Sequence, residues 1–345
     1  MIRGGEELVR MTKSVQEPVL IVGGSGVVGS RAAKALRKLH PHLPVAIGGR
    51  DLEKASAVAS EIGNADAVRI DLDRTDLGQP EAKRFSAVVM FVKDTSTNAL
   101  LYAQDKGVPY VDVSTATFEI APEVALYASR PSRSPIVLAS HWLAGAALLP
   151  TLHFAEAYAK VDTIAIGAVL DEQDMGGPAA YADYERITQV IAEAQIFEDG
   201  KWVWASGDRS SRVFSAVDGV ETRGQAYSVF DTMTLAAATG ARSVRVDLVL
   251  GESASRRRGE PFSTEFVIEL AGVKHDGSSG RSRHELVHRE GQAPVTAAAV
   301  ATIVERLLGL VGEPVSPGLY LPNAFITPAH MLERLAAFGT QIRSL

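Results

Sequence analysis

The stretch PVLIVGGSGVVGSRAAKAL, residues 18–36, decides the fold of this chain. It begins with a short apolar run, passes through glycines in the spacing G-x-G-x-x-G, and continues as a helical pattern with Val28 and Leu36 on one face. A second apolar run follows at residues 44–49. A buried strand, a glycine-rich turn, a helix and another strand in this order predict the start of a doubly wound sheet.

The first half of the chain repeats this alternation of apolar runs and helical patterns. The runs contain few polar residues, which is typical of strands buried on both faces of a parallel sheet. They occupy residues 18–23, 44–49, 67–72, 87–92, 109–114 and 135–140. Two of the intervening helices, over residues 51–63 and 95–107, end at glycines. The sequence therefore predicts an α/β Rossmann domain over residues 18–144.

After this domain the pattern becomes α+β, with a helix followed by antiparallel or mixed strands. Strands are expected at residues 161–172, 223–230, 243–252, 262–273 and 282–290, a helix at 178–195, and a hairpin at 197–206 that turns at Asp199-Gly200. We expect a second domain over residues 145–293, a C-terminal segment with two helices over residues 294–345, and a polar lead-in over residues 1–17. Residues 253–261, with three consecutive arginines, favour a solvated hairpin turn over an anion site.

Composition restricts the class of protein. The chain has 345 residues, of which 46% are hydrophobic and 22% charged, as in a folded protein of about two domains. A net charge of −6 argues against nucleic acid as a partner. The absence of cysteine excludes thiolate chemistry, and no apolar run reaches the length of about 18 residues that a membrane span needs. Because the first residues lack the apolar core of a signal peptide, we expect a cytoplasmic protein.

The glycine-rich turn predicts a dinucleotide site. Gly24 permits the tight turn, Gly26 lets the backbone approach a pyrophosphate, and Gly29 lets the helix pack closely on the sheet. The free amide groups and positive dipole end of the helix favour phosphate there. The predicted cofactor contacts are Gly24, Ser25, Gly26, Val27, Val28, Gly29, Arg50, Asp71 and Val92. The alternative is a glycine turn without a ligand.

The end of the second strand predicts which cofactor is used. An acidic residue there binds the adenosine ribose of NAD, but this chain has Gly48, Gly49 and Arg50. Two glycines clear space, and an arginine fits the geometry of a 2′-phosphate, so NADP is expected. Lys54 can add charge, unless Arg50 is only a surface residue. Asp71 either contacts the adenine or caps the next loop.

Beyond these motifs, the chain resembles the saccharopine dehydrogenase family. The resemblance rests on residues 18 to about 120, including GVPYVDVST, and on the C-terminal stretch VTAAAVATIVERLLGL with PGLYLPNAFITPAHMLERLAAFG. It implies a Rossmann domain, a second domain on a mixed sheet that often forms a homodimer, and C-terminal helices that return to the first domain. It also implies hydride transfer between NAD(P) and a carbon–nitrogen bond, although some relatives reduce carbon–carbon double bonds of lipids.

The sequence departs from the family pattern at two places that face the substrate. Many members continue from the strand-end aspartate into a glycine-glutamate pair, whereas here Asp112 continues as VSTATFE. The glycine-proline turn after the sixth strand is replaced by HWLAGAALLP. Both differences predict a substrate other than saccharopine.

Candidate catalytic residues follow from the position of ligands beyond the carboxyl ends of parallel strands. The residues at these ends are Lys93, Asp94, Thr95, Asp112, Ser114, Thr115, His141 and Trp142. His141 is predicted as the acid or base and Asp112 as the group that orients a substrate nitrogen. Lys93 can bind a carboxylate or activate water. Each residue also has a structural alternative. His141 can be a hydrogen-bonded histidine at the domain boundary, Asp112 can cap the next turn, and Lys93 can be an exposed lysine.

The second domain adds candidates from one helix and one loop. Tyr181, Tyr184 and Arg186 follow the loop DMGGP, which can close over the substrate, and Tyr181 is included among the catalytic residues. Asp231 and Thr232 are expected in a loop. No metal site is predicted, because the eight histidines are scattered and the pair His284 and His288 on one expected strand lacks a third ligand.

These observations favour an NADP(H)-dependent oxidoreductase that acts on an imine, amine or amino-acid-like small molecule. One alternative is an NADPH-dependent enoyl reductase of a lipid-like substrate, which a large apolar cleft would favour. The other is a non-catalytic NADPH-binding sensor.

Overall fold

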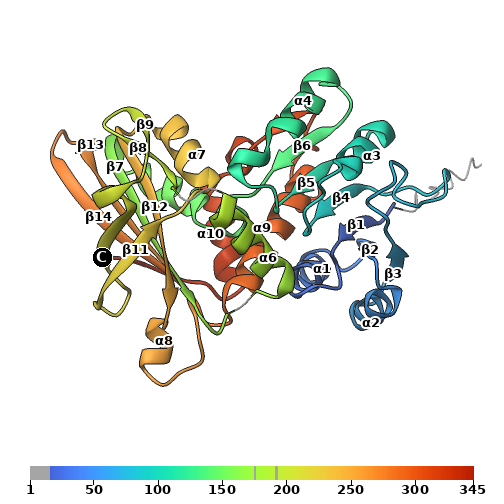
Figure 1. Cartoon of the computed structure of the whole chain (residues 1–345), viewed down its shortest axis with the longest axis horizontal. Helices are drawn as coiled ribbons and strands as arrows, with labels where there is room; N and C mark the ends of the chain where they lie inside the picture. The colour runs from blue at the N-terminus through green and yellow to red at the C-terminus, as the bar shows by residue number, and fades with distance from the viewer. Residues whose placement is uncertain (1–15, 175, 191–192) are drawn as a thin grey trace, which may run out of the picture.

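The computed structural model describes residues 16–174, 176–190 and 193–345, and it contains two sheets joined through a helical layer (Figure 1). The first sheet has seven parallel strands in the order β15-β6-β5-β4-β1-β2-β3. Their bounds are β1 Val19–Val22, β2 Val45–Gly49, β3 Ala65–Arg69, β4 Ala87–Met90, β5 Tyr110–Asp112, β6 Pro135–Leu138 and β15 Gly318–Tyr320. This sheet confirms the predicted doubly wound Rossmann fold.

Alternate residues of the parallel strands face two separate hydrophobic layers. Val19 and Ile21 of β1 pack with the helices α1 (Val27–Leu39), α2 (Leu52–Ile62) and α9 (Gln292–Leu307). Leu20 and Val22 pack on the opposite side with α3 (Asn98–Lys106). Because both faces are covered, the strands have few polar residues, which is the pattern that the sequence displays.

The second sheet is mixed and is organised around one long strand. Strand β7 (Tyr158–Asp171) pairs in parallel with β12 (Ser243–Gly251) and antiparallel with β13 (Thr264–Lys274). The order is β10-β11-β12-β7-β13-β14-β16, and the remaining bounds are β8 Gln195–Glu198, β9 Lys201–Trp204, β10 Ser211–Ser215, β11 Glu221–Ala226, β14 Ser279–His288 and β16 Gln341–Ser344. The predicted hairpin of β8 and β9 is present, with both turn residues at positive φ.

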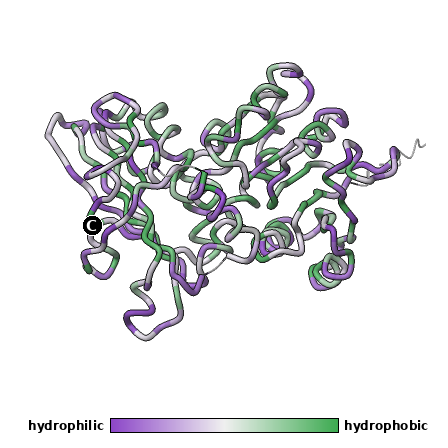
Figure 2. Tube along the Cα trace, viewed as in Figure 1, coloured by the Kyte–Doolittle hydropathy of each residue, from purple (hydrophilic) through white to green (hydrophobic). Residues whose placement is uncertain are grey.

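Helices fill the space between the two sheets, where Figure 1 shows α6 (Pro178–Val190), α9 and α10 (Pro328–Ala337). Helix α7 (Phe230–Thr239) packs with the second sheet, α5 (Leu148–Ala155) packs with α7, and α4 (Ala121–Ser129) precedes β6. One continuous hydrophobic core joins β1, α9 and the inner face of the second sheet. Hydrophobic stretches follow these strands and central helices in Figure 2.

The C-terminal segment returns to the first domain, as the family resemblance implied, but it contains more than helices. Helix α9 packs on α1, and β15 extends the parallel sheet beside β6. Helix α10 packs on α5 and α9, and β16 then joins the second sheet beside β14. The sequence analysis predicted the two helices and missed both strands.

Other local predictions were wrong in instructive ways. Asp231 and Thr232 lie in the first turn of α7 and not in a loop. Residues 253–261 do not form a hairpin turn, because β7 lies between β12 and β13, and the connection contains the short helix α8 (Ala254–Arg257). All three of its arginines form ion pairs: Arg256 with Asp171, Arg257 with Asp218 and Arg258 with Glu260.

Candidate active site

The glycine-rich turn has the close backbone packing that the motif predicts. A Cβ on Gly29 would lie 2.4 Å from the carbonyl oxygen of Gly23, and one on Gly24 would lie 2.7 Å from that of Ile21. Gly26 is the N-cap of α1 and is exposed, and no side chain among the described residues caps the helix. With no acidic residue in its first turn, α1 presents free amide groups and a positive dipole end to an anion.

The end of β2 leaves room for a phosphate and places a cation beside it. A Cβ on Gly49 would meet only the Ser25 hydroxyl, at 3.6 Å. Arg50 is exposed and forms no ion pair within the described part of the chain. The nearby acid, Asp51, caps α2 through the amide of Lys54 and pairs with the Lys54 ammonium at 3.2 Å. Gly49 and Arg50 therefore fit a 2′-phosphate on the ribose, whereas the charge of Lys54 is paired with that of Asp51.

The remaining predicted cofactor residues surround the same turn. Val92, after β4, lies against Gly23, where a Cβ would be 2.9 Å from its methyl group. Val27 at the start of α1 touches Gly177, which belongs to the loop before α6. Asp71 is exposed and accepts a hydrogen bond from the Asp73 amide at 3.1 Å, so it caps its own loop as in the alternative prediction.

A charged cluster lies at the carboxyl ends of β4 and β5. The Lys93 ammonium is 3.6 Å from the Glu119 carboxylate, and Arg186 of α6 binds the same carboxylate oxygen. Arg186 also donates to the Ser114 carbonyl at 3.0 Å and pairs with Asp183 at 2.8 Å. Although burial opposes it, the hydrogen bond from Arg186 keeps the pKa of Glu119 below its usual value. Two cations from different domains therefore converge on one anion.

Asp112 is buried beneath this cluster and stabilises the turn that follows β5. Its carboxylate accepts hydrogen bonds from the Ser114 amide at 2.6 Å, the Ser114 hydroxyl at 2.9 Å and the Thr115 hydroxyl. These contacts favour the capping role over a contact with a substrate nitrogen. Asp94 similarly caps α3 through the Ala99 amide at 2.8 Å, and Thr95 is exposed.

His141 follows β6 and is buried between the first domain and α7. Its Nε2 lies 2.8 Å from the Thr234 hydroxyl, and its ring packs on Phe230. Burial lowers the pKa of His141 to about 3, so the imidazole is neutral near pH 7. This differs from the titrating acid or base that was predicted for His141, because its burial depends on how α7 packs against the end of β6.

The Trp142 backbone is tied to α7 by a buried carboxyl. Asp231 accepts a hydrogen bond from the Trp142 amide at 2.6 Å and is fully buried. Burial raises the pKa of Asp231 to about 7. The Trp142 ring lies edge-on to Tyr227, which stacks on Tyr184 of α6. Trp142 therefore packs between the domains, as its structural alternative predicted.

The two tyrosines of α6 have different environments. Tyr184 belongs to the aromatic group with Tyr227, whereas Tyr181 is 47% exposed. A hydrogen bond with Glu185 raises the pKa of Tyr181. Beside the aromatic group is a pocket of about 440 Å³, lined among others by Ile187, Ala226 and Leu248 with Arg223 at its edge.

The sequence analysis missed Glu119, Glu123, Asp183 and Tyr227. Glu119 and Glu123 come after the turn beyond β5, and an acidic residue in a polar segment is normally solvated. Their only signal was the unusual continuation VSTATFE, which contains Glu119 and was noted for a different reason. Tyr227 was assigned to a strand that in fact ends at Ala226.

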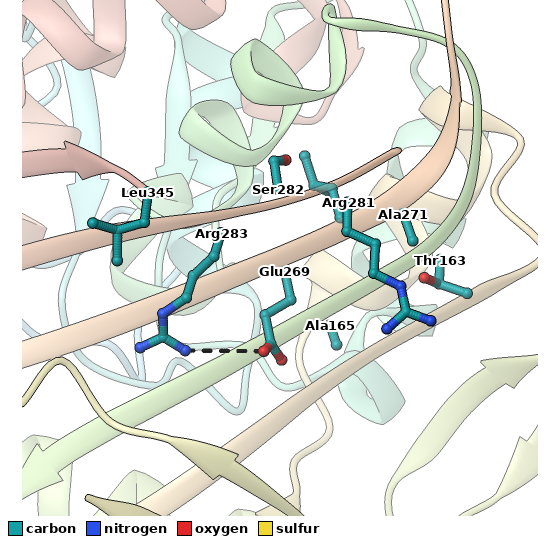
Figure 3. A pocket seen from close by; sticks show the side chains of 9 residues that line it. Thr163, Ala165, Glu269, Ala271, Arg281, Ser282, Arg283 and Leu345 are labelled. Atoms are coloured by element: carbon teal, nitrogen blue, oxygen red, sulfur yellow. Dashed lines mark ion pairs between the residues drawn. The ribbon is translucent and has the colours of Figure 1, made fainter. Parts of the chain in front are cut away.

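A second hollow lies entirely on the second sheet. It is about 450 Å³ and includes Thr163, Glu269, Arg281 and Arg283 (Figure 3). Figure 3 shows Arg283 pointing to Glu269, and their charged groups are 3.9 Å apart. No residue of the parallel sheet lines this hollow, so it is distinct from the site at the strand ends.

Within the described residues, no group of His, Asp and Glu is arranged to hold a metal ion, and no helix is long and apolar enough to cross a bilayer.

Together, the glycine turn at the start of α1 and the cation beyond β2 indicate an oxidoreductase with a nicotinamide cofactor bound at the parallel sheet. Residues 19–144 match the family model of the saccharopine dehydrogenase NADP binding domain. Residues 19–144 therefore form a saccharopine dehydrogenase-like NADP binding domain, as the resemblance in this part of the sequence implied, and the cofactor of this domain is NADP.

One solved structure agrees with this chain at the level of the fold. Apo saccharopine dehydrogenase (L-Glu forming) from Saccharomyces cerevisiae is 13% identical, with a TM-score of 0.63 and coverage of 95% of this chain and 100% of that one. Myo-inositol 2-dehydrogenase from Lactobacillus plantarum is 10% identical, with a TM-score of 0.46 and coverage of 94% and 95%. A comparison with curated proteins finds no match.

Proposed function

We propose that the protein transfers a hydride between NADP(H) and the carbon–nitrogen bond of an amino-acid-like amine or imine. The observation that carries this proposal is the convergence of Lys93 and Arg186 on the carboxylate of Glu119 at the ends of β4 and β5. A substrate carboxylate carries the same charge and shape as the Glu119 group. It can therefore take the place of Glu119 between the two cations.

Each residue has a distinct role in this proposal. Bound NADPH supplies the hydride. Arg186 holds the substrate carboxylate through its planar guanidinium, and Lys93 donates a proton toward the substrate nitrogen. Asp112 positions the turn that carries Thr115, and the neutral His141 supplies a hydrogen-bonding group after β6. Tyr181 stays a predicted substrate contact because it lies on the same helix as Arg186.

The first experiment tests the cofactor site by fluorescence titration with NADPH and NADH. We expect Arg50→Ala to weaken NADPH binding by about tenfold to a hundredfold and to leave NADH binding unchanged, because only NADPH has the 2′-phosphate. Arg343→Ala, which removes an exposed cation from β16, is the matched control. Equal losses for both nucleotides would show that Arg50 does not read the phosphate.

The second experiment tests the substrate class by following NADPH oxidation with cyclic and open-chain imines that do or do not carry a carboxylate. We expect turnover only with carboxylated imines. Arg186→Met should raise KM for them and leave NADPH binding unchanged. An Arg186→Met variant with an unchanged KM would show that Arg186 does not bind a substrate carboxylate.

A reductase of lipid-like carbon–carbon double bonds is the second candidate. The pocket of about 440 Å³ beside Tyr184 and Tyr227 supports it, because nine of the fourteen residues that line the pocket have apolar or aromatic side chains. Enoyl substrates tested in the same assay distinguish the two chemistries. A protein that binds NADPH and turns over neither class would instead be the non-catalytic sensor.

We also propose the domain limits 18–144, 145–293 and 294–345, a cytoplasmic location and a homodimer. The face of the second sheet that carries Arg281, Arg283 and Glu269 is the surface we assign to the dimer. Sedimentation equilibrium of the wild-type protein and of Arg281→Glu tests this assignment. A wild-type monomer at all concentrations would contradict it.

A further inference from the structure

Thr115 connects three charged or ionisable side chains under the strand ends. Its hydroxyl oxygen lies 3.0 Å from the Lys93 ammonium and 2.8 Å from the Glu123 carboxyl, and it also contacts the Asp112 carboxyl. A threonine hydroxyl has one hydrogen and two lone pairs. Lys93 can only donate, so it uses one lone pair. The single hydroxyl hydrogen can then satisfy only one of the two carboxyl groups.

The surrounding contacts decide which carboxyl is ionised. Asp112 accepts two further hydrogen bonds from Ser114, which stabilise its negative charge. Glu123 lies on α4, is 3% exposed, and has an oxygen without a hydrogen-bond partner among the described residues. Burial, and then the charge of Asp112, raise the pKa of Glu123 well above its usual range. Asp112 is therefore the anion, and Glu123 holds a proton that it donates to Thr115.

This arrangement uses the one hydrogen and both lone pairs of the Thr115 hydroxyl. The hydroxyl donates to Asp112 and accepts from Lys93 and from protonated Glu123. The ionisable groups that face Glu123 are Asp112 and Tyr110 of β5 and Lys93 after β4. Tyr110 is fully buried, and burial raises its pKa far above the neutral range, so it keeps its own proton.

We propose that Glu123 is a proton reservoir that recharges Lys93 through the Thr115 hydroxyl. The idea rests on the proposed function, in which Lys93 gives one proton to the substrate nitrogen as the carbon accepts hydride. Lys93 is then a neutral amine and accepts the hydrogen of Thr115, while Thr115 takes the proton of Glu123. One proton leaves Glu123, one reaches the substrate, and Lys93 and Thr115 regain their starting forms. Solvent must reprotonate Glu123 before the next turnover, because two adjacent buried carboxylates repel each other.

Infrared spectroscopy tests the reservoir without any substrate. The carbonyl stretch of a protonated carboxyl should persist in the wild-type protein near neutral pH and be lost in Glu123→Gln. Asp231→Asn is the control, because it removes only the band of Asp231, which is separate from that of Glu123. Lys93→Met should raise the pH at which the Glu123 band disappears, since the ammonium favours the carboxylate. A Glu123 band that is absent, or that Lys93→Met does not move, overturns the inference.

Kinetics test the use of the proton. Glu123→Gln should lower kcat about tenfold or more with an unchanged KM for NADPH, and should abolish the pH dependence that Glu123 imposes. Thr115→Val should behave similarly, and Thr115→Ser, which keeps a hydroxyl, should restore turnover. A Glu123→Gln enzyme with wild-type kcat and pH profile overturns the reservoir. If the wild-type protein reduces no imine, the proposed function fails, whereas the infrared bands still decide whether Glu123 stores a proton coupled to Lys93.

Discussion

The buried carboxyl of Asp231 gives a quantitative prediction about stability. Its pKa rises from 3.8 to about 7 on folding. Between these values the folded protein holds a proton that the unfolded chain releases, so stability decreases as the pH rises through this window and is constant above it. Three pH units at about 1.4 kcal/mol each correspond to a loss of up to about 4 kcal/mol.

Substituting Asp231→Asn should remove this loss. The amide oxygen still accepts the hydrogen bond from the Trp142 amide, as the protonated carboxyl does at acidic pH. We therefore expect the variant to be more stable than the wild type by up to about 4 kcal/mol at mildly alkaline pH and about equally stable at acidic pH.

Urea denaturation at several pH values measures the difference. The wild-type protein also contains Glu123 and Asp174, whose pKa values are raised by burial, so only the difference between variant and wild type isolates Asp231. Asp73→Asn, in an exposed loop, should leave the pH dependence unchanged. A stability difference between wild type and Asp231→Asn that does not change with pH would refute the reasoning.

Two further substitutions test other contacts between distant elements. Gly177→Ala should destabilise the fold and weaken NADPH binding more than Gly219→Ala does. Both glycines have positive φ, but only at Gly177 would the new Cβ lie 2.6 Å from the Val27 side chain. Urea denaturation measures the stability of both variants, and titration measures their NADPH binding. Glu305→Gln should lower the free energy of unfolding by about 3 kcal/mol, because the buried Glu305 carboxylate accepts hydrogen bonds from Arg334 and two histidines. Glu333 is exposed, so Glu333→Gln should change the free energy of unfolding little. If the two glycine variants, or the two glutamate variants, had equal effects, the contact of Gly177 with Val27 or the ion pairs of Glu305 would not have the importance assigned to them.

The parallel sheet could be predicted because its signals are local. A buried strand, a glycine turn and a helix follow one another within residues 18–36, and steric limits on the backbone leave few alternatives. Strands β15 and β16 have three and four residues, and they exist because partners from earlier in the chain offer free edges. A short segment of sequence contains no information about those partners.

The site was predictable in position but not in its detailed chemistry. Lys93 and Thr115 follow from the rule that ligands lie beyond the ends of parallel strands. That Glu123 would be buried beside them depends on how α4 packs, and that Arg186 would reach Glu119 depends on how the second domain meets the first. The same limit applies to His141, since its pKa is determined by burial and not by its neighbours in the sequence.

The pairing of β15 with β6 has a consequence for synthesis on the ribosome. Strand β6 cannot gain its outer neighbour until residues 318–320 have left the exit tunnel. Until then the nucleotide-binding sheet has an open edge, which is a known route to aggregation. Helix α9, which covers α1, is also made late. Nascent chains stalled before α9 should therefore require chaperones, and NADPH should protect them from proteolysis only after the final strands have been made.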